Sequence, residues 1–245
     1  MSDIIKALET LKENKWIDLT HNVNSSIPKF GAFPNLNIET LYTIEKDGFF
    51  VGRVSFVTQY GTHIDAPIHF SENKRTLEQL ELKELVLPLF VINKEKEVEN
   101  NPDFILTAED ILNWEKENGK IEKDSFVAFA SGWSKRWGKS DFYNKDSNGV
   151  AHTPGWSIEA LDLILNKRGA LAIGHETLDT DASIDIIKNN FLLSEKFVLD
   201  TNKYQVEVLN NLNLLPAKGG VIFIGVPKFD KLPGFPVRAF AIIPN

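Results

Sequence analysis

The stretch that organises this chain is residues 59–70, which read Gln59-Tyr60-Gly61-Thr62-His63-Ile64-Asp65-Ala66-Pro67-Ile68-His69-Phe70. Side chains alternate along an extended strand, so every second residue faces one side, and here these are Gln59, Gly61, His63, Asp65 and, further on, His69. Gly61 leaves room on that face, and Pro67 predicts that the strand ends or bulges before His69. His63 and Asp65 suit adjacent ligands of a metal ion, with His69 free to transfer protons. The alternative is an ordinary strand that carries surface histidines.

This stretch resembles the signature His-x-Gly-Thr-His-x-Asp-x-Pro-x-His of the metal-dependent cyclase family, which includes bacterial kynurenine formamidases and isatin hydrolases. Gln59 stands where the signature has its first His. The resemblance extends over nearly the whole chain, from Trp16 to Pro244. It implies an α/β fold of the swivelling β/β/α type, a single domain over residues 1–245 with a mixed sheet, and association into homodimers or homotetramers.

The resemblance also implies a ligand set that comes from distant parts of the chain. The segment that begins Glu207-Val208-Leu209-Asn210-Asn211 matches a second family pattern and assigns Glu207 to the metal, beside His63 and Asp65. Twelve residues earlier, where the family has a His, this chain has Glu195. With Gln59 and Glu195 in place of two imidazoles, the set is rich in oxygen. We therefore expect one divalent ion, Mn²⁺ or Zn²⁺ with Mg²⁺ less favoured, and not a two-zinc site.

Composition excludes several other classes of protein. The 245 residues are enough for one domain with a sizeable core, and the net charge of −7 argues against a nucleic-acid partner. The chain has no cysteine, so disulfides and thiolate metal sites are excluded. Residues 1–14 are charged and amphipathic, unlike a signal peptide or a membrane span. A cytoplasmic protein that acts on a small molecule, without a membrane partner, is the default expectation.

Apolar periodicity and turn residues predict a mixed α/β chain. Helices are expected where apolar residues recur at helical spacing after a capping residue, and strands where apolar runs are bounded by turn residues. The expected helices are 4–12, 107–117, 158–166 and 191–199. The expected strands are 16–20, 36–44, 51–57, 85–92, 126–130, 169–174, 204–209, 221–226 and 237–243, with a hairpin turn at 46–48.

Candidate substrate contacts lie in three loops. Phe30, in a loop that lines the pocket of the similar family, is either an aromatic wall or a residue packed beneath the loop. Residues 132–156 form a long segment rich in aromatic residues that is expected to cover the pocket mouth. Within it Trp133 and Trp156 could add apolar walls, and Arg136 and His152 could bind a carboxylate or carbonyl or be plain surface residues. His175 or Glu176, which follow a predicted strand, could face the pocket or serve turn and capping roles.

These residues predict a metal-dependent hydrolase. The metal would lower the pKa of a water molecule and polarise a carbonyl, and His69 would transfer the proton of that water. Together these steps would cleave an amide, lactone or cyclic amide of a small aromatic or carboxylate-bearing substrate. The alternative is a protein of the same fold that binds a small ligand or metal and has lost turnover. Nucleotide-dependent oxidoreductases and serine hydrolases are unsupported, because the chain lacks their glycine-rich and Gly-x-Ser-x-Gly motifs.

Overall fold

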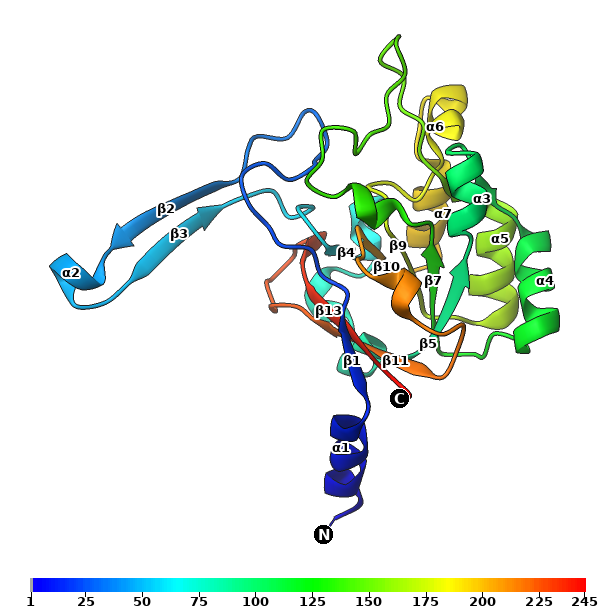
Figure 1. Cartoon of the computed structure of the whole chain (residues 1–245), viewed down its shortest axis with the longest axis horizontal. Coiled ribbons are helices and arrows are strands. Elements are labelled where there is room, and N and C mark those ends of the chain that lie inside the picture. The colour runs from blue at the N-terminus through cyan, green and yellow to red at the C-terminus, as the bar shows by residue number, and fades with distance from the viewer. Residues whose placement is uncertain (1) are drawn as a thin grey trace.

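The computed structural model describes residues 2–245, and its centre is a nine-stranded mixed sheet (Figure 1). Across this sheet the strands follow the order β1 (Lys15–Asp18), β13 (Arg238–Ile243), β11 (Gly220–Gly225), β5 (Val86–Asn93), β7 (Phe126–Ala130), β9 (Ala172–His175), β10 (Tyr204–Glu207), β4 (His63–Asp65) and β12 (Gly234–Pro236). Strands β5, β7, β9 and β10 pair in parallel, while the strands on both flanks pair antiparallel. The predicted α/β fold with a mixed sheet is confirmed.

Two hydrophobic clusters cover the two faces of the parallel centre. Along β5, Leu89 and Val91 point into one cluster and Phe90 and Ile92 into the other, as the alternation of a strand requires. Such strands, buried on both sides, are typical of parallel sheets. The helices that pack on the second face include α4 (Ala108–Asn118), α5 (Ile158–Asp162) and α7 (Leu193–Asp200), with a π-helical turn over Leu163–Arg168.

Local sequence accounts for several of these elements. Helix α4 begins at a capping box, in which the Thr107 hydroxyl accepts the Asp110 amide at 3.2 Å and the Asp110 carboxylate accepts the Thr107 amide at 3.0 Å. It ends at Gly119, whose φ of 85° only glycine adopts without strain. The expected strand 169–174 begins later, as β9, because residues 169–171 still form the turn that leaves the π-helical segment.

The hairpin predicted for residues 36–57 forms β2 (Asn37–Tyr42) and β3 (Val51–Ser55), and the helix predicted near the amino terminus is α1 (Asp3–Glu13). The hairpin turn contains a short helix, α2 (Ile44–Asp47), that ends at Gly48. Both the hairpin and α1 project from the sheet (Figure 1). Sequence periodicity did not predict α3 (Glu95–Asn100), α6 (Ser183–Asn189), β12 or the short pair β6 (Ile105–Leu106) and β8 (Gly155–Trp156).

We also compared the helices with the requirements of a membrane span. Within residues 2–245, every helix is too short or too polar to cross a bilayer.

Candidate metal centre

The signature stretch forms a short strand, and a neighbouring strand brings Glu207 to it. Strand β4 pairs antiparallel with β10, and in this register Glu207 lies opposite His63 and Gln205 lies opposite Asp65. Residues two apart share a face of a strand, so these four side chains meet on one face of the sheet. Gly61, just before β4, has a φ of 66°, and a Cβ there would lie 2.7 Å from Val23 Cγ2. The glycine of the signature therefore permits the tight entry into this strand.

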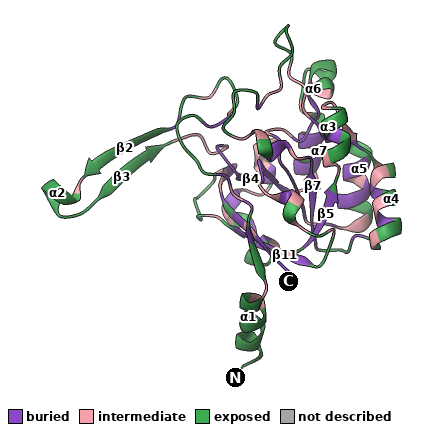
Figure 2. Cartoon of the chain, in the orientation of Figure 1, coloured by how far each residue is buried: buried purple, intermediate pink, exposed green. Residues whose placement is uncertain are grey.

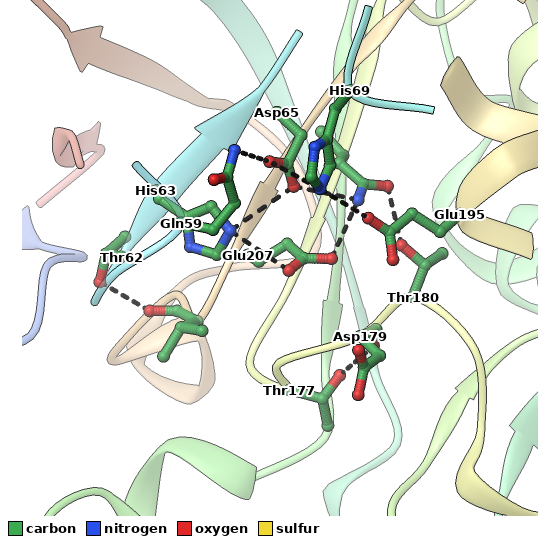
Figure 3. Close-up of polar contacts among 12 residues, drawn as sticks. Gln59, Thr62, His63, Asp65, His69, Thr177, Asp179, Thr180, Glu195 and Glu207 are labelled. Atoms are coloured by element: carbon green, nitrogen blue, oxygen red, sulfur yellow. Dashed lines mark hydrogen bonds and ion pairs between the residues drawn. The ribbon is translucent and has the colours of Figure 1, made fainter. Parts of the chain in front are cut away.

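Three side chains form what we call the inner cluster: His63, Asp65 and Glu207 (Figure 3). His63 Nε2 lies 3.5 Å from Asp65 Oδ2 and 3.4 Å from Glu207 Oε2, and each of the three residues is at most 3% exposed. His63 Nδ1 lies 2.9 Å from the Gly61 carbonyl oxygen, which only an Nδ1–H can satisfy. That hydrogen bond leaves Nε2 directed at the two carboxylates, as in histidines that bind metals.

A second group, the outer cluster, shares Asp65 and adds His69 and Glu195. Pro67 ends the strand and begins a 3₁₀ turn, η1 (Pro67–His69), which confirms the predicted break before His69. His69 Nε2 lies 3.9 Å from Asp65 Oδ1 and 3.7 Å from Glu195 Oε1, and 25% of the His69 side chain is exposed. Glu195 comes from the first turn of α7, where the Asp181 carboxylate accepts its amide at 2.9 Å.

Gln205 is a residue of this site that the sequence analysis missed. Its Nε2 donates to Glu207 Oε1 at 2.9 Å and to Asp65 Oδ2 at 3.3 Å, and its Oε1 accepts the Thr180 hydroxyl at 2.7 Å. Gln205 is fully buried, and the Thr180 bond fixes which end of its amide faces the carboxylates. Its position two residues before Glu207 on the same strand face is the sequence signal that identifies it.

The buried carboxylates give the site strong electrostatic coupling. Burial alone would lower the pKa of His63, but the Asp65 and Glu207 carboxylates outweigh it and raise this pKa well above its usual range. For Asp65, burial would raise the pKa, but His63 and then His69 outweigh it and lower this pKa to about 2. Burial, reinforced by Glu207 and then Asp65, raises the pKa of Glu195 well above its usual range. Burial, and after it the Glu207 carboxylate, also raises the pKa of Asp179, to about 7. The site therefore gathers four carboxyl groups, those of Asp65, Asp179, Glu195 and Glu207, around the imidazoles of His63 and His69.

The residues present fit a divalent cation. One imidazole nitrogen and two carboxylate oxygens of the inner cluster converge on a small buried volume, all within 4.8 Å of one another. Burying such carboxylates is costly unless a proton or a cation compensates them. Gln59 does not present an oxygen there: its Nε2 donates to Asp65 Oδ1 at 3.3 Å and its Oε1 accepts the Thr58 hydroxyl. The structure thus places Gln59 beside the cluster as a hydrogen-bond donor.

Both clusters open into one cavity of about 420 Å³. Its walls are largely apolar, and none of the lining residues in the described part of the chain is a lysine or an arginine. They are Phe30, Gly31, Phe33, Gln59, His63, His69, Phe70, Tyr143, Leu178, Asp179, Leu192, Glu195 and Glu207. Phe30 is one of the lining residues, which agrees with the first of its two predicted roles, that of an aromatic wall. Clefts of this size and character hold small apolar ligands.

Six of the predicted substrate contacts are absent from the lining of this cavity: Trp133, Arg136, His152, Trp156, His175 and Glu176. Trp133 is 2% exposed and donates its indole N–H to the Phe142 carbonyl, and Arg136 stacks on Trp133 and pairs with Asp141.

His152 and His175 also lie outside the lining of the cavity. His152 Nδ1 lies 2.8 Å from Asp103 Oδ2. His175 is 1% exposed within β9, and its Nε2 lies 3.3 Å from Glu207 Oε1, behind the inner cluster.

The other predicted aromatic wall, Trp156, is fully buried, and the Glu176 carboxylate accepts hydrogen bonds from the Ser131 amide and from the hydroxyls of Ser131 and Ser134. From the long segment 132–156 only Tyr143 lines the cavity. From the loop after β9 the lining residues are Leu178 and Asp179, which lie three and four residues beyond His175. The loop that follows β9 thus reaches the cavity through residues beyond the two that the sequence analysis named.

Comparison with known proteins agrees with this architecture. The model of a protein family described as a cyclase matches residues 17–182. An isatin hydrolase of Roseibium aggregatum is 31% identical over 219 residues, which cover 86% of this chain and 82% of that protein. A kynurenine formamidase of Bacillus anthracis is 31% identical over 84 residues, and the match covers 34% of this chain and 40% of that protein.

Solved structures extend the similarity to the whole fold. Isatin hydrolase A from Ralstonia solanacearum superposes with a TM-score of 0.91 at 27% identity, and the alignment covers 99% of this chain and 98% of that one.

Proposed function

Because this chain belongs to the cyclase family, whose named relatives here are hydrolases, we propose that it is a metal-dependent hydrolase that opens the ring amide of a neutral aromatic substrate. The observation that carries the proposal is the inner cluster of His63, Asp65 and Glu207 at the floor of an apolar cavity. Similarity to an isatin hydrolase over most of both chains supports hydrolysis of an aromatic amide.

The inner cluster is suited to hold one divalent ion, Mn²⁺ or Zn²⁺. One nitrogen and two carboxylate oxygens match ions that accept mixed nitrogen and oxygen ligands. When bound, such an ion lowers the pKa of a water molecule and polarises a carbonyl. Metal analysis of protein grown in metal-replete medium should give about one equivalent per chain. Two equivalents of zinc would contradict the single-ion site and would bring His69 and Glu195 into a second one.

His69 is positioned to transfer protons at this site. It lies on the cavity wall, partly open to solvent, with Asp65 and Glu195 flanking its Nε2. A neutral His69 can take the proton of the attacking water as the new C–O bond forms. It then returns that proton to the leaving nitrogen as the C–N bond breaks, which gives an amine and a carboxylic acid, and the acid loses its proton to solvent to become a carboxylate.

The lining of the cavity favours a neutral substrate over an anionic one. Apolar walls from Phe33, Phe70 and Leu192 suit a flat aromatic ring. Asp179, Glu195 and Glu207 line the same cavity, and within the described residues neither a lysine nor an arginine lines it. A substrate that carries its own carboxylate would lie beside these acidic side chains with no lysine or arginine to pair with, which is unfavourable in a cavity of low dielectric constant. This selects a cyclic amide such as isatin over an amino-acid formamide such as that of kynurenine.

The test is a rate comparison on purified protein with Mn²⁺ or Zn²⁺. We expect hydrolysis of isatin that a chelator abolishes, and a kcat/KM for the formamide of kynurenine at least ~10-fold lower, as one unfavourable charge contact of about 1.4 kcal/mol requires. A reversed preference would refute the neutral-substrate assignment. Binding of these compounds without turnover of any of them would instead support the alternative of a protein that binds ligand on the same fold.

A further inference from the structure

The carboxyl group of Asp179 lines the cavity but belongs to neither of the two clusters. In Figure 3 it lies apart from the side chains of both. The Thr177 hydroxyl donates to the backbone carbonyl of Asp179 at 2.8 Å, which leaves the carboxyl group itself without a hydrogen bond or ion pair to any described residue of the chain. The mechanism proposed above gives this group no role, so its place in the cavity needs another explanation.

Hydrogen bonds on both sides of Asp179 hold its loop in place. Before it, the Thr177 carbonyl accepts the Val208 amide at 3.2 Å. After it, the Thr180 hydroxyl donates to Gln205 Oε1 at 2.7 Å. All four of these neighbours are buried. A side chain on a backbone fixed in this way is positioned in advance to meet a ligand.

The surroundings of Asp179 call for a hydrogen-bond donor. Strand β4, which carries His63 and Asp65, is buried in the body of the molecule (Figure 2). Asp179 is itself partly buried, and Glu207 is the charged residue that raises its pKa most, so Asp179 lies near the inner cluster. An acidic group withdrawn from water is costly unless it is hydrogen-bonded. Protonated or not, it keeps an oxygen that accepts a hydrogen bond, so we expect the ligand of the cavity to supply the donor.

The proposed substrate carries such a donor. In a ring amide the carbonyl oxygen and the N–H group project from the same edge of the ring, whereas an open-chain secondary amide prefers them on opposite sides. We propose that Asp179 accepts the ring N–H of the substrate while the neighbouring carbonyl oxygen faces the inner cluster, so that Asp179 selects ring amides with a free N–H. This inference rests on the proposed function, because the ring amide is the group that the hydrolase would cleave.

A single N–H group suits this position better than a charged amine does. An ammonium group carries three N–H donors, and each of them needs an acceptor when it leaves water. Leu178, the neighbour of Asp179 in the lining, is apolar, as are Phe33 and Leu192 elsewhere on the wall. One acceptor among apolar side chains matches one donor on a flat ring.

The first test compares the hydrolysis of isatin with that of N-methylisatin, which lacks the ring N–H. The wild type should favour isatin in kcat/KM by about 10–100-fold, the usual worth of a hydrogen bond to a charged group. Asp179→Leu keeps a branched side chain but removes the acceptor, so this preference should fall by the same factor. Asp179→Asn keeps one acceptor oxygen and should retain part of the preference. Both substrates meet every variant, so their difference in intrinsic reactivity cancels.

An unchanged preference in Asp179→Leu would overturn the proposal, because it would mean that the methyl group is excluded by its size alone. The matched control is Leu178→Ala, which alters the same wall without touching the acceptor. It should change KM for both compounds by a similar factor and leave the preference intact. Should Leu178→Ala abolish the preference as well, the shape of the wall and not the acceptor would set it.

Two further readouts exclude other roles for Asp179. Asp179→Leu should keep its bound metal, and loss of the ion would show that Asp179 is a ligand of the metal instead. Its rate on the formamide of kynurenine, whose amino-acid part carries an ammonium group, should fall no more than its rate on isatin. A larger loss on the formamide would show that Asp179 binds that ammonium group, and either result would overturn the proposal.

Binding gives a test that needs no turnover. In metal-loaded His69→Gln protein, calorimetry should show that isatin binds about 10–100-fold more tightly than N-methylisatin, and adding Asp179→Leu should remove the difference. Equal affinities before that change would overturn the inference. The two proposals fail in different ways: a wild type that hydrolyses neither compound would refute the proposed function and the inference with it, whereas equal hydrolysis of both compounds would refute the inference alone.

Discussion

The inner and outer clusters share Asp65 but are built differently. His63 and Glu207 come from paired strands and are at most 3% exposed, while His69 comes from a 3₁₀ turn with a quarter of its side chain exposed and Glu195 from the start of a helix. Oxygen and nitrogen atoms fixed by a strand register keep their mutual distances, as an ion requires. A histidine at the edge of a cavity can reach both substrate and water. This difference is the reason that we propose ion binding at the inner cluster and proton transfer at the outer one.

The substitution expected to have the largest effect is His63→Ala. It removes the only imidazole of the inner cluster and leaves Asp65 and Glu207 facing each other without compensation. Bound metal should fall to a small fraction of an equivalent, and turnover by ~10³-fold or more, because the ion contributes several kcal/mol to the barrier reduction. Metal analysis and initial rates measure both quantities.

A matched control is His152→Ala. This histidine also lies beside carboxylates, Asp103 and Asp146, but outside the cavity. It should keep its metal and its rate. If His152→Ala lost as much metal as His63→Ala, the assignment of the ion to the inner cluster would be wrong.

The second substitution, His69→Gln, separates the two clusters. Bound metal should stay close to the wild-type value, while kcat falls by about 10²–10⁴-fold, the usual contribution of a positioned acid or base. Equilibrium dialysis with Mn²⁺ and steady-state kinetics on the same preparation measure the two effects. Parallel loss of metal and rate would mean that His69 binds the ion, and the contrast between the clusters would disappear.

Part of this site could be predicted from sequence because it is local. His63, Asp65 and His69 lie within seven residues, and their spacing together with Pro67 predicted a strand that breaks before the second histidine. Glu207 could be placed because the segment around it resembles a family pattern. Its approach to His63 depends on the pairing of β4 with β10, which no local pattern encodes.

The substrate contacts were harder to predict because they depend on the paths of loops. The segment 132–156 carries several aromatic residues, yet Trp133 turns inward to the Phe142 carbonyl and only Tyr143 reaches the cavity. Strand β9 extends through His175, so this side chain is buried with the strand. The loop that follows the strand presents Asp179 to the cavity instead. Sequence gives the residue types of such loops but not which of them turns inward.

Gln205→Met should have the smallest effect of the three, and it tests why the inner cluster is rigid. Gln205 donates to both Asp65 and Glu207, and Thr180 fixes its orientation. Methionine keeps the volume but removes both donors, so the affinity for metal should fall by about 10–100-fold, as for other residues that orient metal ligands. Because Gln205 does not line the cavity, saturating metal should restore most of kcat in this variant and leave its KM unchanged. If the variant had instead lost a substrate contact, its KM would be raised at any metal concentration. The control is Gln59→Met, which removes one donor to Asp65 from a partly exposed position and should weaken metal binding less than Gln205→Met does. If Gln59→Met weakened metal binding more, Gln59 would be the residue that orients Asp65.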